Sequence, residues 1–152
     1  MITYRTALPT DAPALASLRV DFLIEAGNMP PDADRAEMER TLLDFFTRAL
    51  ANGSFVAWLA LNGDKIIATS GMSFSSYPPA YGRGGEVVYV SNMYTLPDYR
   101  RRGIAEEIFK RLLAEAKTRG CHKLNLYASD MGRPLYEKFG FHGKHSYMEY
   151  SL

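Results

Sequence analysis

The sequence has little cysteine and almost no excess charge, and each shortage excludes a class of protein. A single cysteine, Cys121, occurs among the 152 residues. No internal disulfide can form, so the chain is expected in a reducing compartment, the cytoplasm. Lys and Arg number 18 and Asp and Glu number 17, which leaves a formal net charge of +1. This balance lacks the electrostatic footprint of a protein that binds nucleic acid or an anionic membrane.

Long apolar runs are missing as well. Charged or polar residues interrupt every segment before it reaches the length of a membrane-spanning helix. The first residues, Met1–Arg5, lack the apolar core of a secretory signal. His122, His142 and His145 show no metal-ligand spacing with carboxylates, so no metal site is expected. The composition, 47% hydrophobic, without repeats or linkers, is typical of one globular domain over residues 1–152.

The pattern of apolar residues predicts helices alternating with strands. Strands are expected over residues 2–6, 55–61, 66–74, 87–90, 123–127 and 141–150. Helices are expected between the cap at Thr10-Asp11 and the stop at Gly27, and then over residues 32–50, 102–119 and 133–138. The order β-α-α-β-β-β-α-β-α-β(β) indicates an α/β fold, a mixed sheet of six to seven strands with helices on both faces.

A glycine that opens the third long helix is the most informative feature. A continuous apolar strand runs through a short loop into Arg100-Arg101-Arg102, and Gly103 follows at the helix start. Free N–H groups and the positive end of the helix dipole lie there, so a diphosphate could bind. Neither the Gly-Lys-Ser/Thr of a P-loop nor the three glycines of a dinucleotide fingerprint is present. The alternative is a capped turn beside a solvated basic surface.

Two motifs resemble those of one enzyme family. Arg100-Arg101-Arg102-Gly103-Ile104-Ala105 fits the R/Q-x-x-G-x-G/A signature of GNAT acetyltransferases. Leu135-Tyr136-Glu137-Lys138-Phe139-Gly140-Phe141 matches their LYEKxGF segment. The motifs occur in the family's order, separated by one helix and one strand, and the element order resembles the family over nearly the whole chain. The sequence is therefore identified as a member of the GNAT superfamily.

This resemblance implies a splayed sheet that binds acetyl-CoA between its fourth and fifth strands, without a metal. It implies cofactor contacts from Met93, Tyr94, Thr95, Arg100, Arg101, Arg102, Gly103, Ile104, Ala105, Glu106, Ser129 and Tyr136. Tyr136 corresponds to a tyrosine that many members keep near the thioester sulfur, which implies a general acid.

Three positions depart from the family pattern. Ser129 and Gly132 stand where members often have Asn and Ala, and Tyr89 stands where histone-type members have a glutamate base. Glu86 begins the same strand and is the nearest candidate base. Strand alternation places Glu86 and Tyr89 on opposite faces, which favours a water relay for the amine proton.

The expected activity is transfer of the acetyl group of acetyl-CoA to a primary amine in a ternary complex. The acceptor is a small molecule or peptide. The segments expected to form the walls of its site are Phe22–Arg40 and Tyr77–Gly85, and they carry no recognisable specificity code. Alternatives are a non-catalytic acyl-CoA-binding or sensing domain and another nucleotide-binding α/β domain. A homodimer is also compatible with the sequence.

Overall fold

The computed structural model describes residues 1–143 and 146–152. Its strands are β1 (Ile2–Thr6), β2 (Phe55–Asn62), β3 (Lys65–Ser76), β4 (Glu86–Thr95) and β5 (Leu124–Asn125). Its helices are α1 (Ala12–Glu25), α2 (Arg35–Asn52), α3 (Ile104–Thr118) and α4 (Arg133–Lys138), with short 3₁₀ turns at Pro9–Asp11 and Pro97–Tyr99. The strands follow one another in a five-stranded sheet, β1-β2-β3-β4-β5. Only the β4–β5 pair is parallel, so the sheet is mixed, as predicted.

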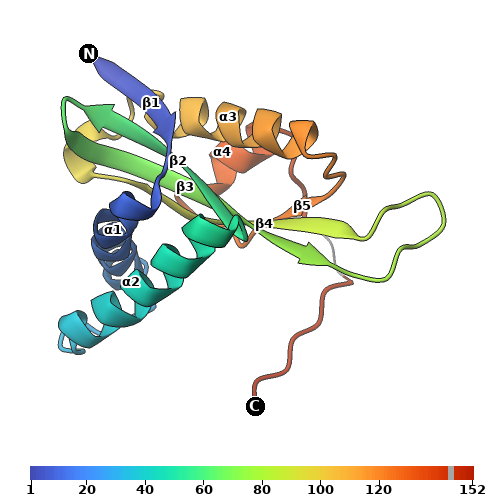
Figure 1. Cartoon of the computed structure of the whole chain (residues 1–152), viewed down its shortest axis with the longest axis horizontal. Coiled ribbons are helices and arrows are strands. Elements are labelled where there is room, and N and C mark those ends of the chain that lie inside the picture. Colours follow the sequence, from blue (N-terminus) through green and yellow to red (C-terminus); the bar gives the residue numbers. More distant parts are fainter. Residues whose placement is uncertain (144–145) are drawn as a thin grey trace.

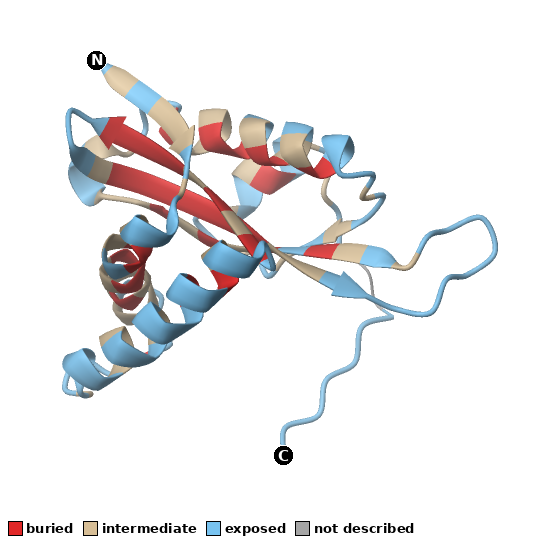
Figure 2. Cartoon of the chain, viewed as in Figure 1, coloured by how far each residue is buried: buried red, intermediate tan, exposed pale blue. Residues whose placement is uncertain are grey.

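Helices cover both faces of the sheet. α1 and α2 lie on one face, and α3 and α4 lie on the other (Figure 1). The buried residues follow β2, β3 and the inner sides of the helices (Figure 2). Phe109 of α3 is fully buried in one apolar cluster, and Leu59 of β2 is fully buried in the other, beneath α1 and α2. The architecture agrees with the sequence prediction.

Element ends follow local capping. β1 and α4 have the predicted bounds. α2 begins at Arg35 rather than residue 32, because the Asp34 side chain accepts a hydrogen bond from the Glu37 N–H at 3.0 Å and caps the helix. It ends before Gly53, which adopts a left-handed conformation with φ of 77°.

The C-terminal segment corrects the predicted strand count. In the described parts of residues 141–150 no strand forms, and the sheet has five strands rather than six or seven. The predicted strand 141–150 includes residues 144 and 145, and with them His145, which lie outside the described residues. Side chains hold what is described: Phe141 packs on Phe109, with ring centroids 5.6 Å apart, and the Tyr147 and Tyr127 hydroxyls are bonded to each other. The apolar pattern that predicted this strand therefore reflects side-chain packing rather than a backbone ladder.

β4 is longer than predicted, and it bends. Thr69 pairs with Tyr94 while Gly71 pairs with Ser91, so β4 carries one residue more than β3 between these pairs. Asn92, at this bulge, has a φ of 58°. β5 contacts β4 only at the Val88–Leu124 and Tyr89–Asn125 pairs. Beyond them the second half of β4 has no β5 neighbour, and the two strands splay apart.

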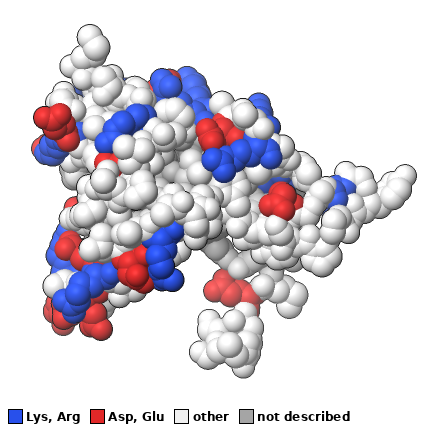
Figure 3. Space-filling view, viewed as in Figure 1, with Lys and Arg blue, Asp and Glu red and all other residues white. Residues whose placement is uncertain are grey.

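Acidic and basic side chains are interspersed. Figure 3 shows both signs mixed over α2 and α3, without a broad field of one sign on this face. In the part of the chain that is described, no helix has the length and apolar character needed to cross a membrane.

Candidate active site

A wide cleft lies beside the paired parts of β4 and β5, among these strands, α4 and the C-terminal segment. Its volume is about 1130 Å³. Tyr89 of β4, Tyr127 after β5 and Tyr136 of α4 line it together with residues of the C-terminal segment. Of the residues expected to contact the cofactor, Tyr136 lines this cleft, whereas Met93, Tyr94, Thr95 and the loop before α3 do not.

The loop before α3 has the geometry of an anion cradle. Arg101 and Gly103 both have positive φ, 61° and 75°. No side chain caps α3 among the described residues, so the N–H groups of its first turn lack an acceptor within the helix. A Cβ atom at Gly103 would meet no protein atom within 4 Å. Glycine is thus required here by backbone conformation, and the space beside it is open to a ligand.

The arginines of this loop differ in what they contact. Arg100 donates to the Thr95 carbonyl at 2.9 Å and to the Glu25 carboxylate at 2.7 Å. Arg102 donates to the Asp98 carbonyl at 2.7 Å. Arg101 is exposed and makes no side-chain hydrogen bond to another described residue. Of the three guanidinium groups, that of Arg101 is therefore the one available to an incoming phosphate.

The two motifs recognised in the sequence meet in space. Lys138 of α4 donates to Glu106 in the first turn of α3 at 2.7 Å. The Ser129 hydroxyl accepts a hydrogen bond from the Gly132 N–H at 3.1 Å and orders the turn that enters α4. This turn fixes the start of the helix that carries Tyr136. The contact between Glu106 and Lys138 holds α4 against the helix start.

Tyr136 is almost fully buried, and its ring is fixed by neighbours. The ring packs edge-on against Phe109, with centroids 5.4 Å apart, and against Phe141. Its hydroxyl has no hydrogen-bond partner among the described residues. Burial, with a smaller contribution from Tyr89, raises the pKa of Tyr136 to about 12. The phenol therefore keeps its proton at neutral pH.

The two candidate base positions lie on opposite faces of β4. Glu86 begins the strand on the side of Val88 and Val90, which pack under α3, and accepts a hydrogen bond from the Ser76 hydroxyl. Tyr89 lines the cleft on the other side. Burial raises the pKa of Tyr89, so this phenol is neutral at pH 7. Among the described residues that line the cleft, the only carboxylate that could act as a base is that of Glu137 in α4.

One polar residue near Tyr89 escaped the sequence analysis. Arg19 of α1 lies with its guanidinium carbon 5.2 Å from the centroid of the Phe22 ring. Its charge acts on Tyr89, where it offsets part of the rise in pKa that burial causes. The apolar pattern predicted a helix here but gave no reason to single out a lone arginine within it. Its only signal was a charge flanked by apolar residues.

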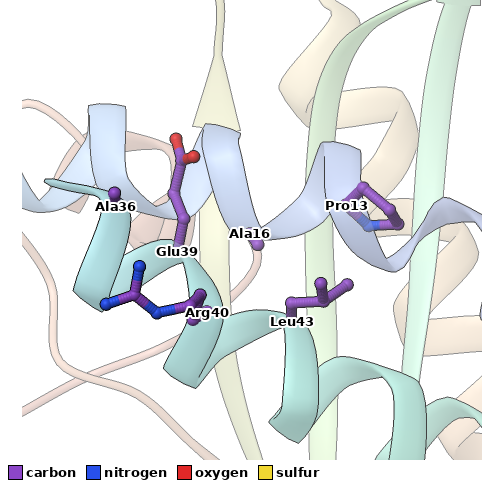
Figure 4. Close-up of a pocket in the computed structure, with 6 residues that line it drawn as sticks. All are labelled: Pro13, Ala16, Ala36, Glu39, Arg40 and Leu43. Atoms are coloured by element: carbon purple, nitrogen blue, oxygen red, sulfur yellow. The ribbon is translucent and has the colours of Figure 1, made fainter.

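A second hollow, of about 290 Å³, lies apart from this cleft. It runs between α1 and α2 and is lined by Pro13, Ala16, Ala36, Glu39, Arg40 and Leu43 (Figure 4). None of these residues lines the β4–β5 cleft. Over residues 1–143 and 146–152, no three His, Cys, Asp or Glu side chains gather as metal ligands.

Solved structures with the same fold include acetyltransferases. A predicted acetyltransferase with acetyl-CoA from Clostridium acetobutylicum is 39% identical, with a TM-score of 0.91 over 100% of this chain and 97% of that chain. A GCN5-related N-acetyltransferase from Ralstonia eutropha JMP134 is 27% identical, with a TM-score of 0.88 over 100% of this chain and 99% of that one.

Sequence comparison agrees with the structural likeness. Glucosamine 6-phosphate N-acetyltransferase of Trypanosoma brucei brucei is 31% identical over 75 residues, which are 49% of this chain and 51% of the relative. The chain thus spans about half the length of the curated relatives it matches. Residues 15–141 match the profile of the Acetyltransferase (GNAT) family. Because this match covers most of the sequence and includes both motifs, the chain belongs to the GNAT family of acetyltransferases.

Proposed function

We propose that the protein transfers the acetyl group of acetyl-CoA to a primary amine of a small molecule or peptide, within a ternary complex. Membership of the GNAT family supports acetyl transfer in general. The observation that carries the finer proposal is Tyr136, a protonated phenol that lines the cleft beside β4 and β5. A buried acid with no hydrogen-bond acceptor in the described protein has its proton free for a departing thiolate.

The proposed cofactor contacts are those expected from the sequence, with one redistribution. The amides from Arg101 to Glu106 would hold the pyrophosphate, and the exposed guanidinium of Arg101 would add charge. Met93 and Tyr94 would offer backbone groups on the splayed edge of β4 to the pantetheine arm. Arg100 already donates a hydrogen bond to the Thr95 carbonyl. Arg100 and Thr95 would therefore hold the loop in shape rather than contact the cofactor directly. Ser129 would act through the turn before α4.

Acetyl transfer to an amine requires two proton steps. Acetyl-CoA, when bound, supplies the acetyl group as a thioester. An alkyl amine titrates near ~10.4 and a thiol near ~8.5, so the amine must lose a proton and the thiolate must gain one. Tyr136 would give its phenol proton to the sulfur. A backbone N–H near Tyr94 would polarise the thioester carbonyl.

The amine proton would leave through water. Tyr89 is neutral and cannot accept a proton at pH 7, and Glu86 faces away from the cleft. A cleft of about 1130 Å³ has room for ordered water beside an acceptor. This arrangement supports a relay to bulk solvent, with Glu86 as the less favoured base.

The proposal is tested in two stages. Binding of acetyl-CoA is measured first by calorimetry, and release of coenzyme A is then followed with amino sugars, amino acids, polyamines, aminoglycosides and peptides. Amine-dependent release with an acetylated product supports the proposal. The second candidate, a non-catalytic acyl-CoA-binding domain, is favoured by Tyr89 at the base position. Binding without release, for every amine, would support that candidate.

A further inference from the structure

Arg19 is the exception among the partly buried basic residues. Among the residues that the structure describes, four arginines and no lysine have intermediate exposure: Arg5, Arg19, Arg100 and Arg111. Three of these bind a carboxylate at 2.7–2.8 Å, in the pairs Arg5–Asp11, Arg100–Glu25 and Arg111–Glu107. Within the described residues, Arg19 has no carboxylate within 4.0 Å and its side chain makes no hydrogen bond. A partly desolvated guanidinium without a counter-charge is unfavourable, so something outside the described chain is expected to complete this site.

The position of Arg19 indicates what would complete it. α1 packs against β4, and Arg19 stacks on Phe22 one turn further along the helix. Against the larger rise that burial causes, the charge of Arg19 lowers the pKa of Tyr89. Beyond the effect of burial, Tyr89 in turn raises the pKa of Tyr136. Arg19 therefore lies near Tyr89, which lines the cleft together with Tyr136. The proposed acid and the unpaired guanidinium thus have Tyr89 as a common neighbour.

We infer that Arg19 binds an anionic group on the acceptor, so that the substrate is an amine that also carries a carboxylate or a phosphate. This inference rests on the proposed acetyl transfer. The planar fork of a guanidinium matches both anions in a bidentate geometry. A ligand anion would supply the counter-charge that each of the other partly buried arginines already has. Burial also lowers the pKa of Arg19, as expected where no protein carboxylate opposes the loss of water.

The inference makes a prediction about acceptor classes. Amines with a second positive charge, such as polyamines and aminoglycosides, would bring a like charge toward Arg19 and bind poorly. An amino sugar phosphate or an amino acid would place its anion on Arg19 and its amine toward the thioester. The Trypanosoma relative is named for an acceptor of this anionic class, an amino sugar that carries a phosphate.

The kinetic test uses amines in matched pairs that differ by the anion. Glucosamine 6-phosphate is compared with glucosamine, and an α-amino acid with its amide, by initial rates of coenzyme A release. We expect kcat/KM to be at least tenfold higher for the anionic member of a pair in the wild type. Arg19→Gln should remove this preference, and Arg19→Lys should keep part of it. Arg48→Gln, a control at an exposed arginine of α2 outside the expected acceptor walls, should keep all of it.

A binding test separates this inference from the proposed function. The protein is saturated with coenzyme A, so that the cofactor cradle cannot bind phosphate, and inorganic phosphate or acetate is then titrated by calorimetry. We expect Arg19→Gln to weaken anion binding at least tenfold, with circular dichroism verifying that the variant is folded. If the wild type binds phosphate more tightly than acetate, the anionic group of the acceptor is a phosphate. If it binds acetate more tightly, the group is a carboxylate.

The outcomes are distinct. Equal anion binding by the wild type and Arg19→Gln, or no binding of either anion, would overturn the role of Arg19, even if amines are acetylated. Arg19-dependent anion binding with no turnover of any amine would support the anion site and contradict the proposed acetyl transfer. A cationic amine that outperforms both matched anionic amines would also overturn the inference.

Discussion

The guanidinium of Arg100 lies 2.7 Å from the carboxylate of Glu25, and this pair joins the loop before α3 to the C-terminal end of α1. The Tyr94 hydroxyl donates to the same carboxylate at 3.1 Å. Glu25 thereby connects β4, the cofactor loop and the helix that walls the acceptor side. One surface carboxylate thus fixes the relative positions of the two halves of the candidate site.

The first prediction concerns the stability that Glu25 provides. Hydrogen bonding from Arg100 holds the pKa of Glu25 below its ordinary value. A lowered folded-state pKa stabilises the protein above the unfolded value, near ~4.3, and this stabilisation is lost as the pH falls through the folded value. Glu25→Gln should reduce the free energy of unfolding at pH 7 by about 0.5–1 kcal/mol, because the pair is partly exposed.

Urea unfolding from pH 7 down to pH 3 measures this effect. The gap between wild type and Glu25→Gln should narrow below about pH 4. Asp44→Asn, which removes the more exposed pair with Arg48, is the control and should change stability less at every pH. A gap for Glu25→Gln of the same size at pH 3 and pH 7 would show that the charge of Glu25 contributes nothing.

The second prediction concerns Gly103. Acetyl-CoA at a hundredfold excess over its Kd should stabilise the wild type by about 2.7 kcal/mol. Gly103→Val should abolish this stabilisation, because its side chain occupies the open space beside the first turn of α3. Gly53→Val is a matched control, since Gly53 also has positive φ and open space around it but caps α2. Both variants should lose about 1–2 kcal/mol of stability through backbone strain. Thermal unfolding with and without acetyl-CoA tests this, and a full ligand shift in Gly103→Val would place the cofactor elsewhere.

The third prediction is about the core beneath the site. Phe109 is fully buried and contacts the rings of Tyr136, Phe139 and Phe141. Phe109→Ala should cost about 3–5 kcal/mol of unfolding free energy, because it leaves a cavity among these rings. Phe45→Ala, at a ring that is 44% exposed, should cost much less. Comparable losses in chemical denaturation would mean that the α3 side of the sheet can collapse around the cavity.

Much of this architecture follows from periodicity in the sequence. The apolar spacing of α3 was predicted, and Ile104, Ile108 and Leu112 are buried as it requires. Gly103 was identified because a glycine between a strand and a helix is a local signal. α4 was predicted to the residue, since a proline near its start and a glycine after its end mark its limits.

Features that depend on contacts between distant segments were not predictable in this way. The bulge at Asn92 depends on how β3 pairs with β4, and the residues around it look like an ordinary strand. β5 was expected over five residues and pairs over two, because strand length depends on the neighbour that it meets. Arg19 has significance only beside Tyr89, which is far from it in the sequence.

The fourth prediction concerns the amine proton. If water carries it, kcat/KM should rise with pH toward the pKa of the free amine, because only the neutral amine attacks. Glu86→Gln should give the same profile as the wild type, since Glu86 lies on the α3 face of β4. A limb in the acidic range that disappears in Glu86→Gln would make Glu86 the base and rule out the relay.

The most direct measurement of the account is coenzyme A release by wild type and Tyr136→Phe with one reactive amine, alongside acetyl-CoA affinity from calorimetry. The substitution keeps the ring that packs on Phe109 and removes only the acidic proton. The account predicts amine-dependent release by the wild type, a fall in rate on the order of a hundredfold in Tyr136→Phe, and an unchanged Kd for acetyl-CoA. Full turnover by Tyr136→Phe, with the chemical step limiting, would contradict it and leave Tyr136 as a packing residue.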